Sequence, residues 1–258
     1  MQEILRAEGL RKTFKLTRKQ QRIEHSTETL RVAVDNLSFT VNTGEVFGLL
    51  GPNGAGKTTA LRLLATLIKP DEGDALIEGY SIRTEPEQVR SRIGFLTSEL
   101  KLEDFFTPNY LFDFFAALRN IDPGTAQQRK LELFARFGID EFAQTKVANL
   151  STGMKQKASL VISIVHDPDI IIFDEPTNGL DVITARLVTD YLEELRAVGK
   201  TIILSTHIFS LAEKLCDRVG VIISGRMVAC GTLEEICGDK SLEDRFFELF
   251  MAAGGEVV

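Results

Sequence analysis

The sequence feature that most constrains the fold is a glycine-rich stretch at residues 51–59, GPNGAGKTT, which matches the phosphate-loop pattern GxxxxGK[ST]. The apolar run before it, EVFGLL at 45–50, predicts a strand buried on both faces, and the residues after it predict a helix from Lys57. A glycine turn between a strand and a helix lets backbone N–H groups surround a phosphate, and the helix start adds positive partial charge. We therefore expect phosphate contacts from Gly51, Pro52, Asn53, Gly54, Ala55, Gly56, Lys57, Thr58 and Thr59.

Further apolar runs predict an α/β fold with a doubly wound core. Strand-like runs alternate with helical patterns such as 187–195, which is typical of a parallel sheet with crossover helices. Residues 98–150 interrupt this alternation, because they are rich in helical patterns and contain no evident strand. We expect a single domain over 1–258, with a helical subdomain at 98–150 inserted into a core made of 1–97 and 151–258. The predicted strands are 31–41, 45–50, 93–96, 170–173, 201–205 and 219–223.

Two adjacent carboxylates, Asp174 and Glu175, end the predicted strand at 170–173. The carboxyl ends of parallel strands share one edge of a sheet, so both acids should face the glycine loop. Because side chains alternate along a strand, we expect the two carboxylates to point in different directions. Our hypothesis is that Lys57 reaches the β- and γ-phosphates of a nucleotide, and that Thr58 and Asp174 hold Mg²⁺. Glu175 is then the general base, and the structural alternative is that the acids cap the following turn.

Four further motifs occur in the order that is found in the ABC ATPase family. The string LSTGM at 150–154 is similar to the family signature LSGGQ, and NGLD at 178–181 is similar to its D-loop. The string STH at 205–207 is similar to its switch histidine, and Phe14 to the aromatic residue that stacks on adenine. With the phosphate loop and the two acids, these motifs give a resemblance to the ABC ATPase family over nearly the whole chain.

The resemblance implies a role for each matched residue. Phe14 would stack on adenine, and His207 would contact the γ-phosphate and help to hold the attacking water. Ser151 and the backbone N–H of Gly153 open a predicted helix, and they would complete the γ-phosphate site of a partner subunit. Asp181 would lie at that interface. On the residues alone, a core position for Phe14 and a hydrogen-bonded position at a strand end for His207 remain open.

The resemblance also implies a fold, cofactors and partners. The fold would be a P-loop NTPase core with a mainly parallel sheet, an N-terminal antiparallel β subdomain and an inserted helical subdomain. The cofactors would be ATP and Mg²⁺, and two identical or similar subunits would enclose two ATP molecules head to tail. ATP hydrolysis would drive transport through a separate polytopic membrane permease. The chain would then be cytoplasmic and peripheral, on the cytoplasmic face of the cell membrane.

The chain departs from the family pattern at three positions. Thr152 and Met154 stand where the signature usually has Gly and Gln. A β-branched residue is costly at positive φ, so the backbone at Thr152 is either ordinary or strained. Ser98 stands where many relatives carry a glutamine that contacts Mg²⁺, and a water would have to bridge from its shorter hydroxyl.

Several strings, among them ATLIKP, IGFLTS, STGMKQK and EKLCDR, are similar to the sodium-export (Nat-type) ATPases of the family, and so is the basic segment 15–30. That segment predicts a solvated hairpin or loop, with contact to anionic lipid or a partner as the alternative.

A second local feature is a run of aromatic residues, for which core packing and a groove for a helix of the membrane partner both remain open. These residues are Phe105, Phe106, Tyr110, Phe112, Phe114 and Phe115.

Composition excludes several other function classes. A formal net charge of −7 gives no electrostatic case for nucleic acid as a partner. No apolar run is long enough to cross a bilayer, and Glu3 argues against a signal peptide. Cys216, Cys230 and Cys237 lack a CxxC spacing, so we expect reduced thiols. The alternative function is a soluble ABC ATPase that is not coupled to transport, such as one of iron–sulfur assembly.

Overall fold

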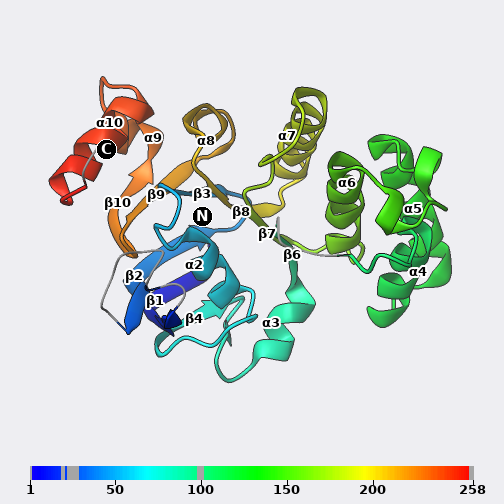
Figure 1. Ribbon diagram of the computed structural model, residues 1–258, viewed down its shortest axis with the longest axis horizontal. Coiled ribbons are helices and arrows are strands. Elements are labelled where there is room, and N and C mark those ends of the chain that lie inside the picture. Colours follow the sequence, from blue (N-terminus) through cyan, green and yellow to red (C-terminus); the bar gives the residue numbers. More distant parts are fainter. Residues whose placement is uncertain (1, 19–20, 22–28, 98–101, 256–258) are drawn as a thin grey trace.

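The computed structural model describes residues 2–18, 21, 29–97 and 102–255, and the strands within them form two sheets (Figure 1). The larger sheet has the order β10-β9-β3-β8-β7-β6, and its neighbouring strands are parallel except for β9 and β10. The mainly parallel sheet is therefore confirmed, whereas the antiparallel edge strand β10 was not predicted. The strands are β3 (Val46–Leu50), β6 (Ile93–Thr97), β7 (Ile170–Asp174), β8 (Thr201–Thr206), β9 (Arg218–Ile223) and β10 (Arg226–Thr232).

Helices cover both faces of this sheet. Every residue of β3, β7 and β8 is buried, as expected for parallel strands that have helices on both sides. In Figure 1, α6, α7 and α8 lie above the sheet, and α2 and α3 lie below it. The helices are α2 (Lys57–Leu64), α3 (Pro86–Arg92), α4 (Pro108–Leu118), α5 (Pro123–Phe137), α6 (Thr152–Ser163), α7 (Val182–Ala197), α8 (Phe209–Leu215), α9 (Leu233–Cys237) and α10 (Leu242–Ala252).

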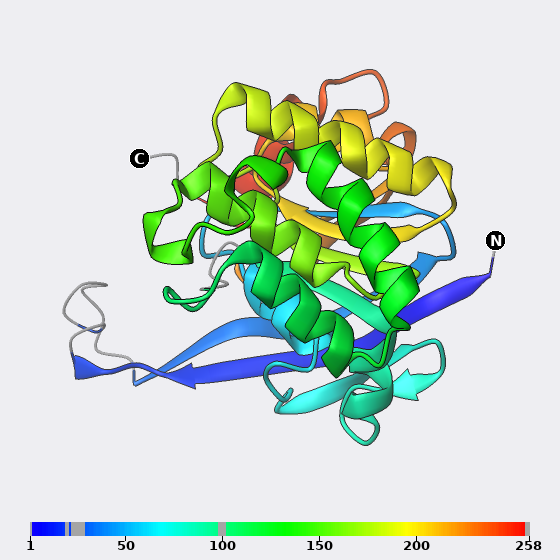
Figure 2. The same cartoon turned by 90° about the vertical axis from the view of Figure 1, so that its right-hand side faces the viewer.

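The smaller sheet is antiparallel, with the order β2-β1-β4-β5, which confirms the N-terminal β subdomain. Its apolar face shares one core cluster with α2 and the larger sheet, in which Leu37, Leu61 and Ile172 are all fully buried. Helix α2 is thus held between the two sheets, and Figure 2 shows β1 and β2 as a long ribbon beneath the helices. The strands are β1 (Glu3–Lys15), β2 (Leu30–Asn42), β4 (Glu72–Ile77) and β5 (Tyr80–Ser81), of which the sequence predicted only β2.

The described residues between β6 and β7 form helices and short 3₁₀ turns, and they contain no strand. Thr107 and Asp122 cap α4 and α5 by accepting hydrogen bonds from the first-turn N–H groups of Tyr110 and Thr125. The buried residues of α4 and α5, such as Phe112, belong to the same apolar cluster as residues of the larger sheet. The helix-rich prediction is confirmed for 102–150, and the division of the chain at 98 and 150 stays a proposal.

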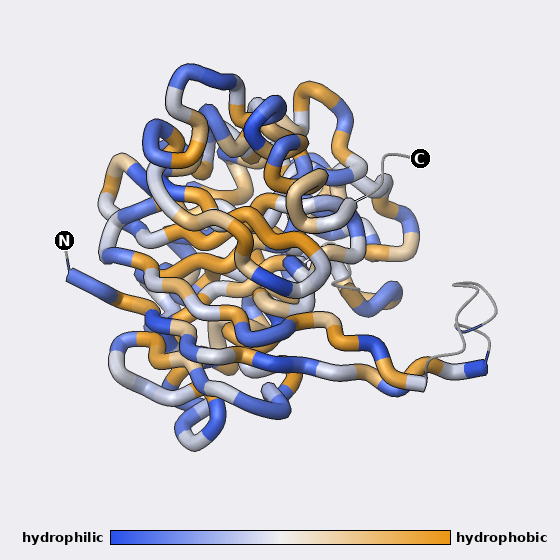
Figure 3. The backbone as a smooth tube through the Cα atoms, turned by 90° about the vertical axis from the view of Figure 1, so that its left-hand side faces the viewer, coloured by the Kyte–Doolittle hydropathy of each residue, from blue (hydrophilic) through white to orange (hydrophobic). Residues whose placement is uncertain are grey.

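The aromatic run divides between the two interpretations. Phe112 is fully buried, and Phe106 and Phe115 are partly buried against the core. By contrast, Phe105, Tyr110 and Phe114 are 63%, 47% and 48% exposed. Figure 3 shows hydrophobic segments running through the middle of the molecule. The exposed fractions of these three rings, by contrast, are those of apolar side chains at the surface. Core packing therefore explains only part of the run.

Two other sequence features are the three cysteines and the basic segment 15–30. Cys216 is buried, Cys237 is partly buried and Cys230 is exposed, and none of them is in a disulfide. In the basic segment, the backbone N–H of Leu16 donates to the carbonyl of Thr29, which continues the pairing of β1 and β2. Residues 19, 20 and 22–28 lie outside the described residues, so the two interpretations of that segment stay as predictions.

Candidate nucleotide-binding site

The phosphate loop lies between β3 and α2, and its glycines are required by close backbone contacts. Gly54 and Gly56 have φ of +81° and +106°, in the left-handed region that favours glycine. A Cβ on Gly56 would lie 2.2 Å from the carbonyl oxygen of Ala33, and one on Gly51 would lie 2.3 Å from that of Ile222. Both distances are far below a van der Waals contact, so the pattern of glycines reflects how tightly β2 and β9 pack against the loop.

Replacing Gly56 by alanine is expected to lower the free energy of unfolding by about 2 to 4 kcal/mol, because backbone strain and a clash with the Ala33 carbonyl add together. The matched control is Gly79→Ala, since Gly79 also has positive φ, +81°, but a Cβ there meets no atom within 4 Å. The control should lose only about 1 to 2 kcal/mol, the cost of the strain. Urea unfolding of both variants measures the difference, and equal losses would contradict the packing argument.

Lys57 is the buried cation of the site, with 5% of its side chain exposed. Its Nζ lies 2.7 Å from the carbonyl oxygen of Gly51, 3.2 Å from that of Pro52 and 3.2 Å from Oε1 of Glu175. The other carboxylate oxygen of Glu175, Oε2, lies 2.8 Å from Nδ1 of His207. The lysine, the acid and the histidine that the sequence singled out are therefore joined in one chain of contacts.

Asp174 has different partners from those of Glu175. Its side chain is buried, and Oδ1 accepts hydrogen bonds from Thr58 Oγ1 at 3.0 Å and Ser205 Oγ at 2.6 Å. The hydroxyl of Thr97 lies 3.5 Å from Oδ2. Thr58 and Asp174, predicted to share a metal ion, are thus in direct contact. Ser205 and Thr97 were not assigned to the site, although both are polar residues at the ends of predicted strands.

The two acids diverge, but not for the reason that the sequence analysis gave. Strand β7 ends at Asp174, and Glu175 has φ of +53°, so it does not continue the alternation of the strand. Its backbone N–H donates to the carbonyl of Ser205, which holds it in this turn. A non-glycine residue in the left-handed region costs on the order of 1 kcal/mol, and such strain is common at functional sites. The two carboxylates therefore point in different directions because a left-handed turn follows the strand, and not because side chains alternate along it.

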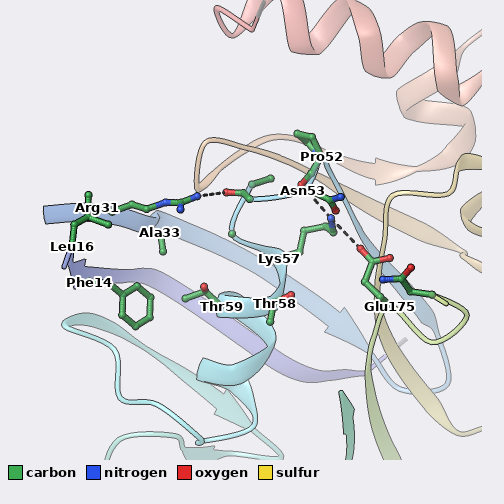
Figure 4. A pocket seen from close by; sticks show the side chains of 14 residues that line it. Phe14, Leu16, Arg31, Ala33, Pro52, Asn53, Lys57, Thr58, Thr59 and Glu175 are labelled. Carbon is green, nitrogen blue, oxygen red and sulfur yellow. Dashed lines mark hydrogen bonds and ion pairs between the residues drawn. The ribbon is translucent and has the colours of Figure 1, made fainter. Parts of the chain in front are cut away.

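A cleft of about 370 Å³ runs along the phosphate loop (Figure 4). Its inner end is lined by Lys57 and Glu175, and its outer end by Phe14, whose ring is 40% exposed. A core position for Phe14 is thereby excluded. The lining residues are Phe14, Leu16, Arg31, Ala33, Pro52, Asn53, Gly54, Ala55, Gly56, Lys57, Thr58, Thr59, Glu175 and Asn178.

Other predicted site residues do not line this cleft. Gly51 contributes a carbonyl to Lys57, Asp174 lies behind Thr58, and His207 contacts the far side of Glu175. Ser98 lies outside the described residues. The sequence analysis did not assign three lining residues of the cleft, because β1 was not predicted and its pairing with β2 was therefore unknown. These residues are Leu16, Arg31 and Ala33.

Ser151, Gly153 and Asp181 lie apart from the cleft, at the starts of two helices. Ser151 caps α6 by accepting a hydrogen bond from the N–H of Met154, and Thr152 is the first helical residue, so its backbone is ordinary and unstrained. Asp181 caps α7 by accepting from the N–H groups of Ile183 and Thr184 and from the Thr184 hydroxyl. These bonds lower the pKa of Asp181, which therefore has a structural role in addition to any role at an interface.

The residues present fit a magnesium ion that is bound mainly by phosphate. The Thr58 hydroxyl and the Asp174 carboxylate are the hard oxygen donors that Mg²⁺ prefers, and they already lie side by side. In the described residues, no cluster of three or more His, Cys, Asp or Glu side chains could hold a metal by itself. This donor set matches an ion that keeps waters and takes its other ligands from a nucleotide.

A phosphate loop between a parallel strand and a helix, with two acids at the carboxyl end of another strand of that sheet, defines a P-loop ATPase. A sequence model of the family described as ABC transporter matches residues 34–178. The ABC transporter ATP-binding protein NatA of Bacillus subtilis (strain 168) is 38% identical over 213 residues, which are 82% of this chain and 87% of that relative. The chain belongs to the ABC transporter family, as an ATP-binding subunit with the ATPase activity of that family. The likeness to NatA supports the Nat-type resemblance.

Further relatives agree with this assignment. The daunorubicin/doxorubicin resistance ATP-binding protein DrrA of Streptomyces peucetius is 37% identical over 204 residues, covering 79% of this chain and 62% of the relative. A solved ATP-binding subunit of an ABC transporter has a TM-score of 0.82 at 28% identity, covering 95% of this chain and 99% of that one. A dimeric ATP-binding cassette bound to ADP and phosphate has the same fold, with a TM-score of 0.78 at 24% identity over 89% of this chain and 98% of that one. Within the described residues, none of the helices has the length and apolar character needed to span a bilayer.

Proposed function

We propose that this chain hydrolyses MgATP at an interface with a second copy, or with a similar chain, and that hydrolysis drives transport through separate membrane subunits. The observation that carries the proposal is the chain of contacts from Lys57 through Glu175 to His207, at the inner end of a cleft that Phe14 closes at its outer end. This arrangement supplies a cation for phosphate, a base for water and an apolar ring for a nucleobase in one continuous cleft.

Binding would begin with adenine on the exposed ring of Phe14 and the phosphates along the loop 51–59. Backbone N–H groups of the loop and the start of α2 would then surround the phosphates. The three N–H donors of the Lys57 ammonium already face Gly51, Pro52 and Glu175, so a bond to a phosphate oxygen replaces at least one of these contacts. Mg²⁺ held by Thr58 and Asp174 would offset phosphate charge.

Hydrolysis would use Glu175 as the general base. Contact with Lys57 and His207 fixes its carboxylate, and the left-handed turn at Glu175 aims it toward the lysine rather than along the strand. In this position it would accept a proton from a water that attacks the γ-phosphate. His207 would hold Glu175 in place and contact the γ-phosphate itself, as a donor aimed at the charge that develops there.

The second subunit would supply the N-terminus of α6. Ser151 and the Gly153 N–H start a helix of 12 residues, and a helix start is favourable for an anion. A Cβ at Gly153 would lie 3.6 Å from Asp181 Oδ2, so the starts of α6 and α7 are close enough to form one surface. We propose that this surface covers the γ-phosphate bound by the other subunit, with Asp181 at the interface.

The names of the relatives favour export as the transport process. A relative from Ralstonia nicotianae is called a Nod factor export ATP-binding protein, and DrrA is called a daunorubicin/doxorubicin resistance ATP-binding protein. We propose that the cargo is of the sodium or drug type, that a polytopic permease selects it, and that this chain works on the cytoplasmic face of the membrane. Nothing in these relatives favours an iron–sulfur assembly ATPase.

Purification from native membranes tests the coupling to transport. Tagged chain extracted in detergent should bring a polytopic membrane protein with it in a defined ratio, because the proposed motor acts only through such a partner. The control is the same tag on a soluble protein of similar acidic charge. Recovery of the chain only in a soluble complex, with no membrane protein, would favour the alternative class.

A further inference from the structure

We propose that Arg31 is a nucleotide-binding residue, whose guanidinium contacts the α-phosphate between the base on Phe14 and the phosphates near Lys57. The inference rests on the proposed function, because it assumes that ATP occupies the cleft. It adds a cationic residue that lies on β2, outside the phosphate loop and the motifs singled out in the sequence.

The pairing of β1 and β2 places Arg31 beside the proposed adenine site. Phe14 and Arg31 are direct partners in the antiparallel register, so their side chains share one face of the sheet. Ala33 follows Arg31 at the alternating position, and all three residues line the cleft. Figure 4 shows the Arg31 side chain extending from β2 along the cleft toward the phosphate loop, with the Phe14 ring nearby.

Contact with the loop fixes where the guanidinium lies. Arg31 Nη2 donates to the carbonyl oxygen of Gly54 at 3.3 Å, so the positive charge is already at the edge of the phosphate loop. A guanidinium carries several N–H donors in a planar fork, a shape that suits phosphate oxygens. Because Phe14 marks the base and Lys57 marks the far phosphates, a cation at Gly54 lies closest to the α-phosphate.

The distribution of charge supports a functional role for this cation. Among the described residues that line the cleft, the charged side chains are Arg31, Lys57 and Glu175. Lys57 pairs with Glu175 at the inner end. Lys12 is near Phe14, 5.8 Å from the ring centroid, but it pairs with Asp71 at 2.8 Å and does not line the cleft. Among the described lining residues, Arg31 is thus the cation that lies on the Phe14 side of the loop.

Two substitutions of Arg31 distinguish a contact between its charge and the nucleotide from a structural role in holding the phosphate loop. Arg31→Lys keeps the positive charge and an N–H donor, whereas Arg31→Gln keeps an N–H donor but loses the charge. The matched control is Arg226→Gln, which removes the same charge from an exposed arginine that pairs with Asp35 and does not line the cleft. Because Arg31 is exposed, we expect all three variants to unfold at temperatures close to that of the parent chain.

Calorimetric titration with MgATP and with MgADP gives the result. We expect Arg31→Gln to raise the Kd for both nucleotides by about 5- to 10-fold, since both carry the α-phosphate. Arg31→Lys should lose clearly less affinity than Arg31→Gln, because it keeps the charge but not the planar fork, and Arg226→Gln should stay within about twofold of the parent chain. The deficit of Arg31→Gln should shrink in about 0.5 M salt, because salt screens an exposed charge contact.

Three outcomes would overturn the inference. Full affinity in Arg31→Gln, or equal losses in Arg31→Gln and Arg31→Lys, would mean that charge at this position does not act on the nucleotide. An equal loss in Arg226→Gln would mean that net charge, and not position, matters. Each of these leaves the proposed function intact, whereas failure of the parent chain to bind MgATP at all would overturn both.

Discussion

Replacing Glu175 by glutamine is expected to lower ATP turnover by about 10²- to 10⁴-fold while leaving MgATP affinity close to that of the parent chain. The amide has nearly the same shape as the carboxylate and keeps an oxygen toward Lys57 and a polar group toward His207, so the cleft should be preserved. It has no basic oxygen to take a proton from water, so the chemical step loses its general base. Steady-state release of phosphate measures turnover, and calorimetry measures affinity.

The matched control is Glu132→Gln, a change of the same kind on α5, where the carboxylate is exposed and accepts a hydrogen bond from Gln128. This control should keep the turnover of the parent chain. If Glu175→Gln hydrolyses ATP at a normal rate, another group must activate the water, and the role proposed for Glu175 is wrong. If Glu175→Gln also binds ATP poorly, the contact of Glu175 with Lys57 is needed for the shape of the cleft, and the loss of turnover does not report on a general base.

Replacing Lys57 by alanine should weaken MgATP binding by about 10- to 100-fold and abolish measurable turnover. A charge-assisted hydrogen bond to a phosphate oxygen is worth about 1.5 to 3 kcal/mol, and each 1.4 kcal/mol corresponds to a factor of ten in Kd. Alanine is a favourable residue in a helix, so α2 should still form. Calorimetric titration with MgATP measures the loss.

Lys214→Ala is the comparison for Lys57→Ala, because Lys214 is a partly exposed lysine that pairs with Glu193 and is not part of the cleft. Its removal should leave both binding and turnover unchanged. An unchanged Kd in Lys57→Ala would refute the proposed phosphate contact. A fall in thermal stability that is much larger in Lys57→Ala would show that the buried contact with Glu175 also stabilises the fold.

The parts of the fold that could be predicted are those with a strong local signal. Strands β3, β7 and β8 are buried on both faces, so each contains an apolar run, and the phosphate loop has glycines at fixed spacing. Strand β1 was missed because buried and exposed residues do not alternate regularly along it. Its pairing with β2 contains several register shifts, so the sequence alone could not place Arg31 opposite Phe14.

The sequence indicated some of the residues of the candidate site, but it did not indicate their geometry. The spacing of short motifs indicated Lys57, Asp174, Glu175 and His207, and the structure joins these residues through direct contacts or shared neighbours. The left-handed turn at Glu175 carries no sequence signal, because it depends on the hydrogen bond from its N–H to Ser205 on another strand. Such turns are set by tertiary contacts, which a pattern of residue types does not contain.

A crystal structure of the Glu175→Gln variant with MgATP is the most direct test of the central claim, that two copies enclose the nucleotide. The account predicts adenine on Phe14, the β- and γ-phosphates at Lys57, and Ser151 of a second copy within hydrogen-bond distance of the γ-phosphate. A nucleotide bound away from this cleft, or a γ-phosphate that no second copy covers although ATP is fully bound, would contradict it.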